Sequence, residues 1–216
     1  MSKIKACIFD LDGVIVDTAV YHYKAWRRLA NQLGFDFTEE QNEELKGISR
    51  IDSLKIILNW GNVSKTDNEI QELATLKNKW YVDMITKMTP SDILPGAKEF
   101  LEAVRAKNYL TALGSASKNS ETILTHIGLM HLFDVLVDGN KVTKSKPDPE
   151  VFLVGAKELN VKPEQCVVFE DAIAGIQAAK AGNMIAVGIG QPAILNEADL
   201  VVEGLFEMTI EKLENL

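Results

Sequence analysis

The chain has little cysteine, no apolar run long enough to cross a bilayer and no excess of basic residues. Its two cysteines, Cys7 and Cys166, each lie in a short apolar segment, which favours buried, reduced thiols and a cytoplasmic location. The longest uncharged run, residues 181–196, is too short for a membrane span and contains glycine and proline. The first residues lack the apolar stretch of a signal peptide. We therefore expect no membrane partner.

The charge balance of the chain is acidic. Thirty-one Asp and Glu residues against 23 Lys and Arg residues give a net charge of −8 at pH 7. Such a charge argues against a nucleic-acid partner, and it requires a local positive site for any anionic substrate. At 216 residues, 46% of them hydrophobic, the chain is long enough for one large domain or for a domain with a small additional one.

Short apolar segments alternate with helical patterns over most of the chain. This alternation predicts a parallel sheet covered on both faces, which is a Rossmann-like α/β fold. Ligands of such sheets bind beyond the carboxyl ends of the strands. The predicted strands are residues 4–9, 109–113, 135–137, 167–169, 184–187 and 200–202, and the helices between them include residues 98–106, 120–127, 149–159 and 172–181.

One long segment departs from this alternation and contains only helical patterns. Capping boxes are predicted at Thr38 and Thr66, and Ser49 is placed to cap a third helix. Glycines at positions 34 and 61 are predicted to end two of the helices. A helical block inserted after the first strand is most simply a separate domain. The predicted domains are a helical cap, residues 17–88, and an α/β core, residues 1–16 and 89–216.

Two acidic residues follow the first predicted strand, in the sequence Asp10-Leu11-Asp12-Gly13. Residues two apart in a strand point to the same side, so Asp10 and Asp12 can converge, and Gly13 permits a sharp turn. Two neighbouring carboxylates beyond a buried strand are costly without a cation or a shared proton. A divalent metal would relieve that repulsion. The alternative is a simple turn in which an aspartate caps the next helix.

Three further segments carry polar groups at comparable places. One strand ends at Ser115, another ends at Glu170 and Asp171, and Lys146 lies in the stiff sequence Lys-Pro-Asp-Pro. In this order, with the Asp10 segment first, the four motifs resemble those of the haloacid-dehalogenase superfamily of phosphoryl-transfer enzymes. The resemblance spans nearly the whole chain. It implies a Rossmann-like core with a small helical cap that opens and closes over the active site.

The resemblance also implies roles for the core residues. Asp10 resembles the nucleophile that forms an aspartyl-phosphate, and Asp12 the general acid and base. Ser115 and Lys146 resemble the groups that hold the oxygens of the transferred phosphoryl group. The implied cofactor is Mg²⁺, with Asp12 contributing its backbone carbonyl. The implied metal ligands are Asp10, Asp12, Glu170 and Asp171.

Three residues of the helical segment are candidates for substrate contacts. Lys77 and His22 fall on the apolar faces of their predicted helices. The alternatives are a lysine that snorkels to solvent and a hydrogen-bonded core histidine. Arg50 offers a guanidinium that matches a phosphate with two hydrogen bonds, and its alternative is an ordinary solvated arginine. With the resemblance included, we expect His22 and Lys77 to face the active-site cleft.

Four stretches of the chain, residues 17–26, 45–50, 77–78 and 115–119, resemble those of the mutases that interconvert β-D-glucose 1-phosphate and glucose 6-phosphate. That reaction would proceed through phosphorylated Asp10 and a β-glucose 1,6-bisphosphate intermediate, with small sugar phosphates as partners and the chain as a monomer. The implied substrate-binding residues are Thr18, His22, Trp26, Gly47, Ile48, Arg50, Lys77, Ala116, Ser117, Lys118 and Asn119.

Two alternatives remain open for the function. A sugar-phosphate phosphatase of the same superfamily shares every core residue, with water as the acceptor. A phosphate-responsive receiver protein also places acidic residues beside a parallel sheet, but it has little use for an acid–base partner such as Asp12. Gly114, before Ser115, and Ala172, after the acidic pair, depart from the expected alanine and serine. Neither departure removes a reacting group.

Overall fold

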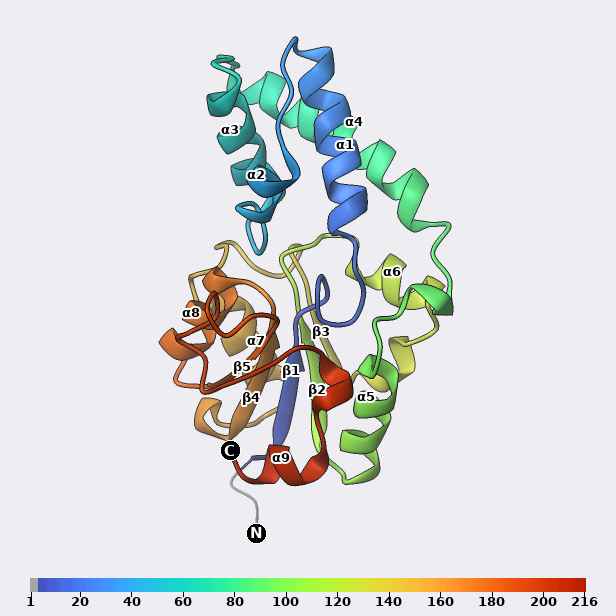
Figure 1. Cartoon of the computed structure of the whole chain (residues 1–216), viewed down its shortest axis with the longest axis vertical. Coiled ribbons are helices and arrows are strands. Elements are labelled where there is room, and N and C mark those ends of the chain that lie inside the picture. The colour runs from blue at the N-terminus through green and yellow to red at the C-terminus, as the bar shows by residue number, and fades with distance from the viewer. Residues whose placement is uncertain (1–3) are drawn as a thin grey trace.

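The computed structural model describes residues 4–216, and these form a parallel sheet flanked by helices (Figure 1). The six strands are arranged in the order β3-β2-β1-β4-β5-β6, and every neighbouring pair is parallel. The predicted α/β fold is therefore confirmed. The strands are β1 (Ala6–Phe9), β2 (Leu110–Gly114), β3 (Val135–Val137), β4 (Cys166–Glu170), β5 (Ile185–Ile189) and β6 (Leu200–Val202).

Helices cover both faces of this sheet because successive strand residues alternate between the faces. On β1, Phe9 packs with Phe100 of α5, whereas Ile8 packs with Phe152 of α7. The first face also receives α6 and α9, and the second receives α8. The helices are α5 (Ala97–Ala106), α6 (Ser120–His126), α7 (Glu150–Glu158), α8 (Ile173–Ala181) and α9 (Ile210–Glu214), and short 3₁₀ turns lie at residues 90–92, 130–132, 163–165 and 205–207.

Four further helices form a second layer beyond the carboxyl ends of the strands, and we call them the helical block (Figure 1). They pack around a separate apolar cluster that includes Trp26, Leu54 and Ile57. The last turns of the fourth helix instead join the cluster of the sheet, through Tyr81 and Ile85. The helices of the block are α1 (Ala19–Gln32), α2 (Glu39–Glu43), α3 (Arg50–Trp60) and α4 (Asp67–Ile85).

The helix starts of the block follow from local hydrogen bonds. Thr38 and Thr66 form the predicted capping boxes at α2 and α4, and the Ser49 hydroxyl accepts a hydrogen bond from the Asp52 N–H at α3. No helix within residues 4–216 is both long and apolar enough to cross a bilayer. The arrangement leaves the carboxyl edge of the sheet facing the block, and the candidate site lies there.

Candidate active site

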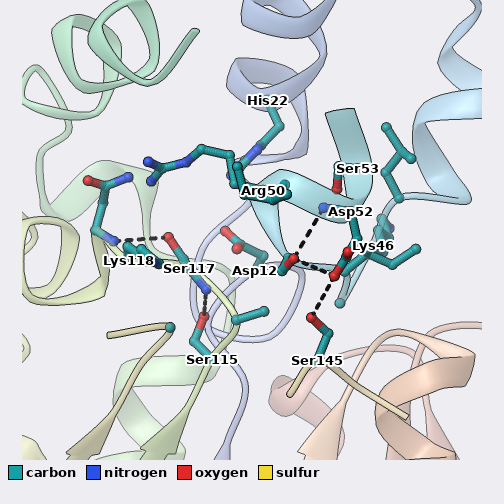
Figure 2. Close-up of a pocket in the computed structure, with 18 of the residues that line it drawn as sticks. Asp12, His22, Lys46, Arg50, Asp52, Ser53, Ser115, Ser117, Lys118 and Ser145 are labelled. Carbon is teal, nitrogen blue, oxygen red and sulfur yellow. Dashed lines mark hydrogen bonds between the residues drawn. The ribbon is translucent and has the colours of Figure 1, made fainter. Parts of the chain in front are cut away.

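A cavity of about 440 Å³ lies between the carboxyl edge of the sheet and the helical block. Both layers contribute to its lining, as the close-up shows (Figure 2). Glu170 is fully buried at the end of β4 and does not line the cavity. The other residues predicted for the site all line it: Asp10, Asp12, Thr18, His22, Trp26, Gly47, Ile48, Arg50, Lys77, Ser115, Ala116, Ser117, Lys118, Asn119, Lys146 and Asp171.

Three carboxylates from two adjacent strands meet at the carboxyl edge of the sheet, where two of them, Asp10 and Asp171, line the cavity. Asp10 follows β1, and Glu170 and Asp171 lie at the end of β4; one oxygen from each lies within 4.8 Å of the others. Because β1 and β4 are paired in register, their ends fall at the same level of the sheet. Carboxylate oxygens are the ligands that Mg²⁺ prefers in proteins, so this set fits a magnesium ion.

A buried lysine balances part of this negative charge. Lys146 Nζ donates hydrogen bonds to Asp10 Oδ1 at 2.6 Å, to Glu170 Oε2 at 2.8 Å and to the Gly114 carbonyl at 3.2 Å. Burial lowers the pKa of Lys146, but the charges of Asp10 and Glu170 raise it more, so the net shift is upward. Burial and the Asp10 charge raise the pKa of Glu170 well above its usual value.

The Asp171 carboxylate pairs with a second lysine, Lys46, and lies close to the backbone of Gly13. Its Oδ2 lies 3.0 Å from Lys46 Nζ. Burial raises the pKa of Asp171 to about 6, and the Lys46 charge opposes that rise. A Cβ atom at Gly13 would lie 2.1 Å from the same oxygen, and Gly13 has a φ of +76°. Glycine is therefore required at position 13 both for the turn and for the carboxylate beside it.

Asp12 lies beside the carboxylate cluster rather than in it. Its Oδ1 accepts a hydrogen bond from the Thr18 hydroxyl, and its backbone N–H donates to Asp10 Oδ2 at 3.0 Å. Burial, followed by the Asp10 charge, raises the pKa of Asp12 to about 7. A carboxyl group with a pKa near neutrality can both give and take a proton, which suits acid–base chemistry.

The loop after β2 supplies hydroxyl and backbone donors. Ser115 is buried at the end of β2, and its hydroxyl accepts from the Ser117 N–H at 3.1 Å (Figure 2). The Ser117 hydroxyl in turn accepts from the Asn119 N–H at 3.2 Å. Both hydrogen bonds lie within the loop between β2 and α6, whose residues line the cavity. The arrangement fits a site for phosphoryl oxygens.

In the helical block, Lys77 is buried and does not reach solvent, so the snorkelling alternative is wrong. Its Nζ lies 2.9 Å from His22 Nδ1, and it faces the rings of Trp26 at 4.2 Å and Tyr81 at 4.8 Å. Burial lowers the pKa of both Lys77 and His22 well below their usual values, and the nearby Arg50 charge adds to this. The pair therefore carries less positive charge than the sequence suggests.

Arg50 begins α3 and faces the cavity. Within residues 4–216 its guanidinium has no hydrogen-bond or ion-pair partner. Figure 2 shows the side chain extending toward the part of the cavity where Ser117 and Lys118 lie. A guanidinium with free donors opposite a serine and a lysine fits a second anionic group of a ligand.

Several lining residues escaped the sequence interpretation. Tyr81 of α4 lines the cavity, and its buried hydroxyl makes no hydrogen bond among the described residues. The Ser145 hydroxyl donates to Asp52 Oδ2 at 3.3 Å, which joins the Lys146 loop to the start of α3. Lys46 directly precedes the predicted Gly47, and this adjacency was the one signal available in the sequence for it.

A family comparison agrees with this geometry. The model of the haloacid dehalogenase-like hydrolase family matches residues 7–189, from β1 to β5. The chain belongs to this family. The match covers all four segments in which the sequence analysis found polar groups at strand ends.

Individual known proteins are similar over most of the chain or nearly all of it. A β-phosphoglucomutase of Bacillus subtilis is 44% identical over 97% of this chain and 94% of its own. The crystal structure of a β-phosphoglucomutase from Clostridium difficile is 46% identical, covers 98% of this chain and 96% of that one, and superposes with a TM-score of 0.96. A phosphorylated-carbohydrate phosphatase of Thermotoga maritima is 32% identical over 84% of this chain and 82% of its own.

Proposed function

We propose that this protein is a Mg²⁺-dependent β-phosphoglucomutase that interconverts β-D-glucose 1-phosphate and glucose 6-phosphate. The observation that carries the proposal is a single cavity with two sets of anion-binding groups. Ser115 and Lys146 lie beside Asp10, and the free guanidinium of Arg50 faces Ser117 and Lys118. The identities of 44% and 46% to two β-phosphoglucomutases support the same reading.

In the proposed reaction, a carboxylate oxygen of Asp10 attacks one phosphorus of the bound β-glucose 1,6-bisphosphate, and the sugar leaves as the monophosphate. The Asp10 oxygen–phosphorus bond forms, the sugar oxygen–phosphorus bond breaks, and Asp12 gives its proton to the departing sugar oxygen. Ser115 donates to a non-bridging oxygen, and Lys146 does so by exchanging one of its three present hydrogen bonds. When bound by Asp10, Glu170, Asp171 and the Asp12 carbonyl, Mg²⁺ would neutralise charge on those oxygens.

The second half of the cavity holds the phosphate that is not transferred. Arg50, Ser117, Lys118 and Asn119 are assigned to that phosphate. Phosphorylated Asp10 gives its phosphoryl group to the free hydroxyl of a bound sugar monophosphate, and Asp12 takes the proton of that hydroxyl. The bisphosphate formed in this way must turn over before Asp10 attacks its other phosphate. The sugar itself is assigned to residues of the helical block and of the segments beside its helices, together with Ala116 from the loop after β2. The block residues are Thr18, His22, Trp26, Gly47, Ile48 and Lys77.

Residues 17–88 are assigned as the cap that closes over this cavity, and residues 1–16 and 89–216 as the core. Closure would exclude water from phosphorylated Asp10, which is what separates a mutase from a phosphatase. That the protein is cytoplasmic and monomeric stays a prediction.

The deciding experiment measures two products from one substrate. Wild-type protein is given β-D-glucose 1-phosphate, Mg²⁺ and a trace of the 1,6-bisphosphate. The appearance of glucose 6-phosphate is then followed in parallel with the release of inorganic phosphate. We expect glucose 6-phosphate to dominate. If inorganic phosphate is the main product, the mutase proposal fails and a sugar-phosphate phosphatase replaces it, as in the Thermotoga maritima relative.

A further inference from the structure

Lys46 links the two layers of the molecule through two carboxylates. Its Nζ lies 2.8 Å from Glu43 Oε2, at the end of α2, and 3.0 Å from Asp171 Oδ2, beyond the end of β4. The Lys46 side chain is 30% exposed, Glu43 is 59% exposed and Asp171 is 9% exposed. A lysine of the helical block therefore reaches down to the buried edge of the sheet.

Lys46 and Lys146 together contact all three carboxylates of the cluster. Lys146 contacts Asp10 and Glu170, and Lys46 contacts Asp171. The two lysines differ in how they are held. Lys146 is 1% exposed and makes three hydrogen bonds within the core, so it is fixed there. Lys46 is partly exposed and has a second anionic partner, Glu43, on its own layer.

We propose that Lys46 is a positioning residue that competes with Mg²⁺ for Asp171, so that the helical block sets the metal affinity of the core. This inference rests on the proposed magnesium site. An ammonium ion and a divalent cation at one carboxylate repel each other, so binding of one weakens binding of the other. Glu43 gives Lys46 an alternative partner, which lowers the cost of releasing Asp171.

This competition couples the metal to the contact between the layers. If Lys46 weakens Mg²⁺ binding, Mg²⁺ must weaken the Lys46–Asp171 contact by the same factor, because coupling between two sites is reciprocal. Two other hydrogen bonds between the layers, Asn119 with Asn78 and Ser145 with Asp52, do not include a carboxylate of the cluster. These contacts link the block to the core and include no residue of the three-carboxylate cluster.

The test is calorimetric titration of Mg²⁺ into the full chain, without substrate and at constant ionic strength. Removal of one partly exposed ion-pair partner is expected to change affinity by about twofold to fivefold. Lys46→Gln should therefore tighten Mg²⁺ binding by that factor. Glu43→Gln should weaken it, because Lys46 is left with Asp171 alone. Lys46→Arg keeps the charge and should bind Mg²⁺ no more tightly than wild type.

Two matched controls separate contact from overall charge. Lys144→Gln removes a cation from the cavity rim, where Lys144 pairs with Asp148 and not with the cluster. Glu44→Gln removes an anion next to Glu43, and within residues 4–216 the ion pairs of Lys46 are with Glu43 and Asp171 and not with Glu44. Lys144→Gln should shift the Mg²⁺ dissociation constant less than Lys46→Gln does, and Glu44→Gln less than Glu43→Gln does. Circular dichroism verifies that each variant is folded.

The possible outcomes separate the competition between Lys46 and Mg²⁺ from the proposed magnesium site on which it rests. Equal shifts for Lys46→Gln and Lys144→Gln, or no tightening in Lys46→Gln, overturn the competition while the metal site stands. A wild-type protein that binds no Mg²⁺ overturns the metal site of the proposed function, and the competition with it. Tightening in Lys46→Gln alone, with weakening in Glu43→Gln, supports the competition.

Discussion

At the scale of single residues, the two aspartates of the first motif have different surroundings. Asp10 belongs to the three-carboxylate cluster and receives a hydrogen bond from Lys146, whereas Asp12 is held by Thr18 and has a pKa raised to about 7 by burial.

Asp10→Asn keeps the size of the side chain and removes the attacking anion. Turnover should fall to background in the coupled glucose 6-phosphate assay, with the thermal unfolding midpoint nearly unchanged. Substantial turnover would rule out Asp10 as the nucleophile.

Asp12→Ala should leave substrate binding intact and slow transfer by a factor of about 10² to 10⁴, the usual contribution of a general acid or base. The loss should depend on the leaving group. Acetyl phosphate needs little protonation of its leaving oxygen, so phosphorylation of Asp10 by acetyl phosphate should be slowed much less than by the sugar phosphate. Rapid-quench measurement of phosphorylated protein provides the comparison, and an equal loss for both donors would contradict the acid–base role.

At the scale of elements, Asp134 joins a helix to two strands. Its carboxylate accepts from Arg105 of α5 at 2.9 Å and from the Thr111 N–H of β2 at 2.9 Å, directly before β3. Burial raises the pKa of Asp134, but these hydrogen bonds lower it more, so the net pKa lies below the usual 3.8. Asp134→Asn should lower the free energy of unfolding at pH 7 by about 1 to 2 kcal/mol.

The free energy of unfolding that Asp134→Asn removes should be larger at pH 7 than at acidic pH. Because the folded pKa is depressed, the anion stabilises the protein above the unfolded value of 3.8, and this contribution is lost as the pH falls through the folded pKa. Urea unfolding at pH 7 and at pH 3 measures the difference, which should shrink at the lower pH. Asp36→Asn, which breaks an exposed pair with Arg27, serves as a control and should cost less. A difference that grows toward low pH would contradict the assignment.

At the scale of the whole molecule, the cavity belongs to neither layer alone. Arg50 lies on the block and Asp10 on the core, so a substrate with two anionic ends would hold the layers together. Binding energy gained at Arg50, remote from phosphorus, should then appear in the rate. Arg50→Ala should lower sugar-phosphate isomerisation by at least about tenfold, whereas hydrolysis of acetyl phosphate should change little.

The measurement compares kcat/KM for β-D-glucose 1-phosphate and for acetyl phosphate in wild type and Arg50→Ala. Lys24→Ala, which removes an exposed cation of α1 outside the cavity, is the charge-matched control. Similar losses for both substrates would indicate that Arg50 acts on the fold and not on the second phosphate.

The sequence by itself determined the elements and the motifs. Strand and helix positions were predictable because apolar spacing and capping are local, and the capping boxes at Thr38 and Thr66 formed as predicted. The position of polar groups at strand ends follows from the same local pattern, since parallel strands end at one edge. Even the unexpected Gly114 has a packing reason, because a Cβ there would lie 2.8 Å from the Phe152 ring, but that reason is visible only in the fold.

Only the tertiary structure decided how residues far apart in the chain meet. Lys77 lies beside His22, 55 residues earlier, and Lys46 lies beside Asp171, so neither contact has a local sequence signal. The periodicity placed Lys77 on an apolar face, but burial against Trp26 depends on how α1 and α4 pack. Which side chains meet across the two layers depends on how the helices and the sheet pack, and the local spacing of residues along the chain does not specify that packing. For that reason the sequence identified the reacting residues of the core, Lys146 among them, and the fold determined which carboxylates each cation contacts.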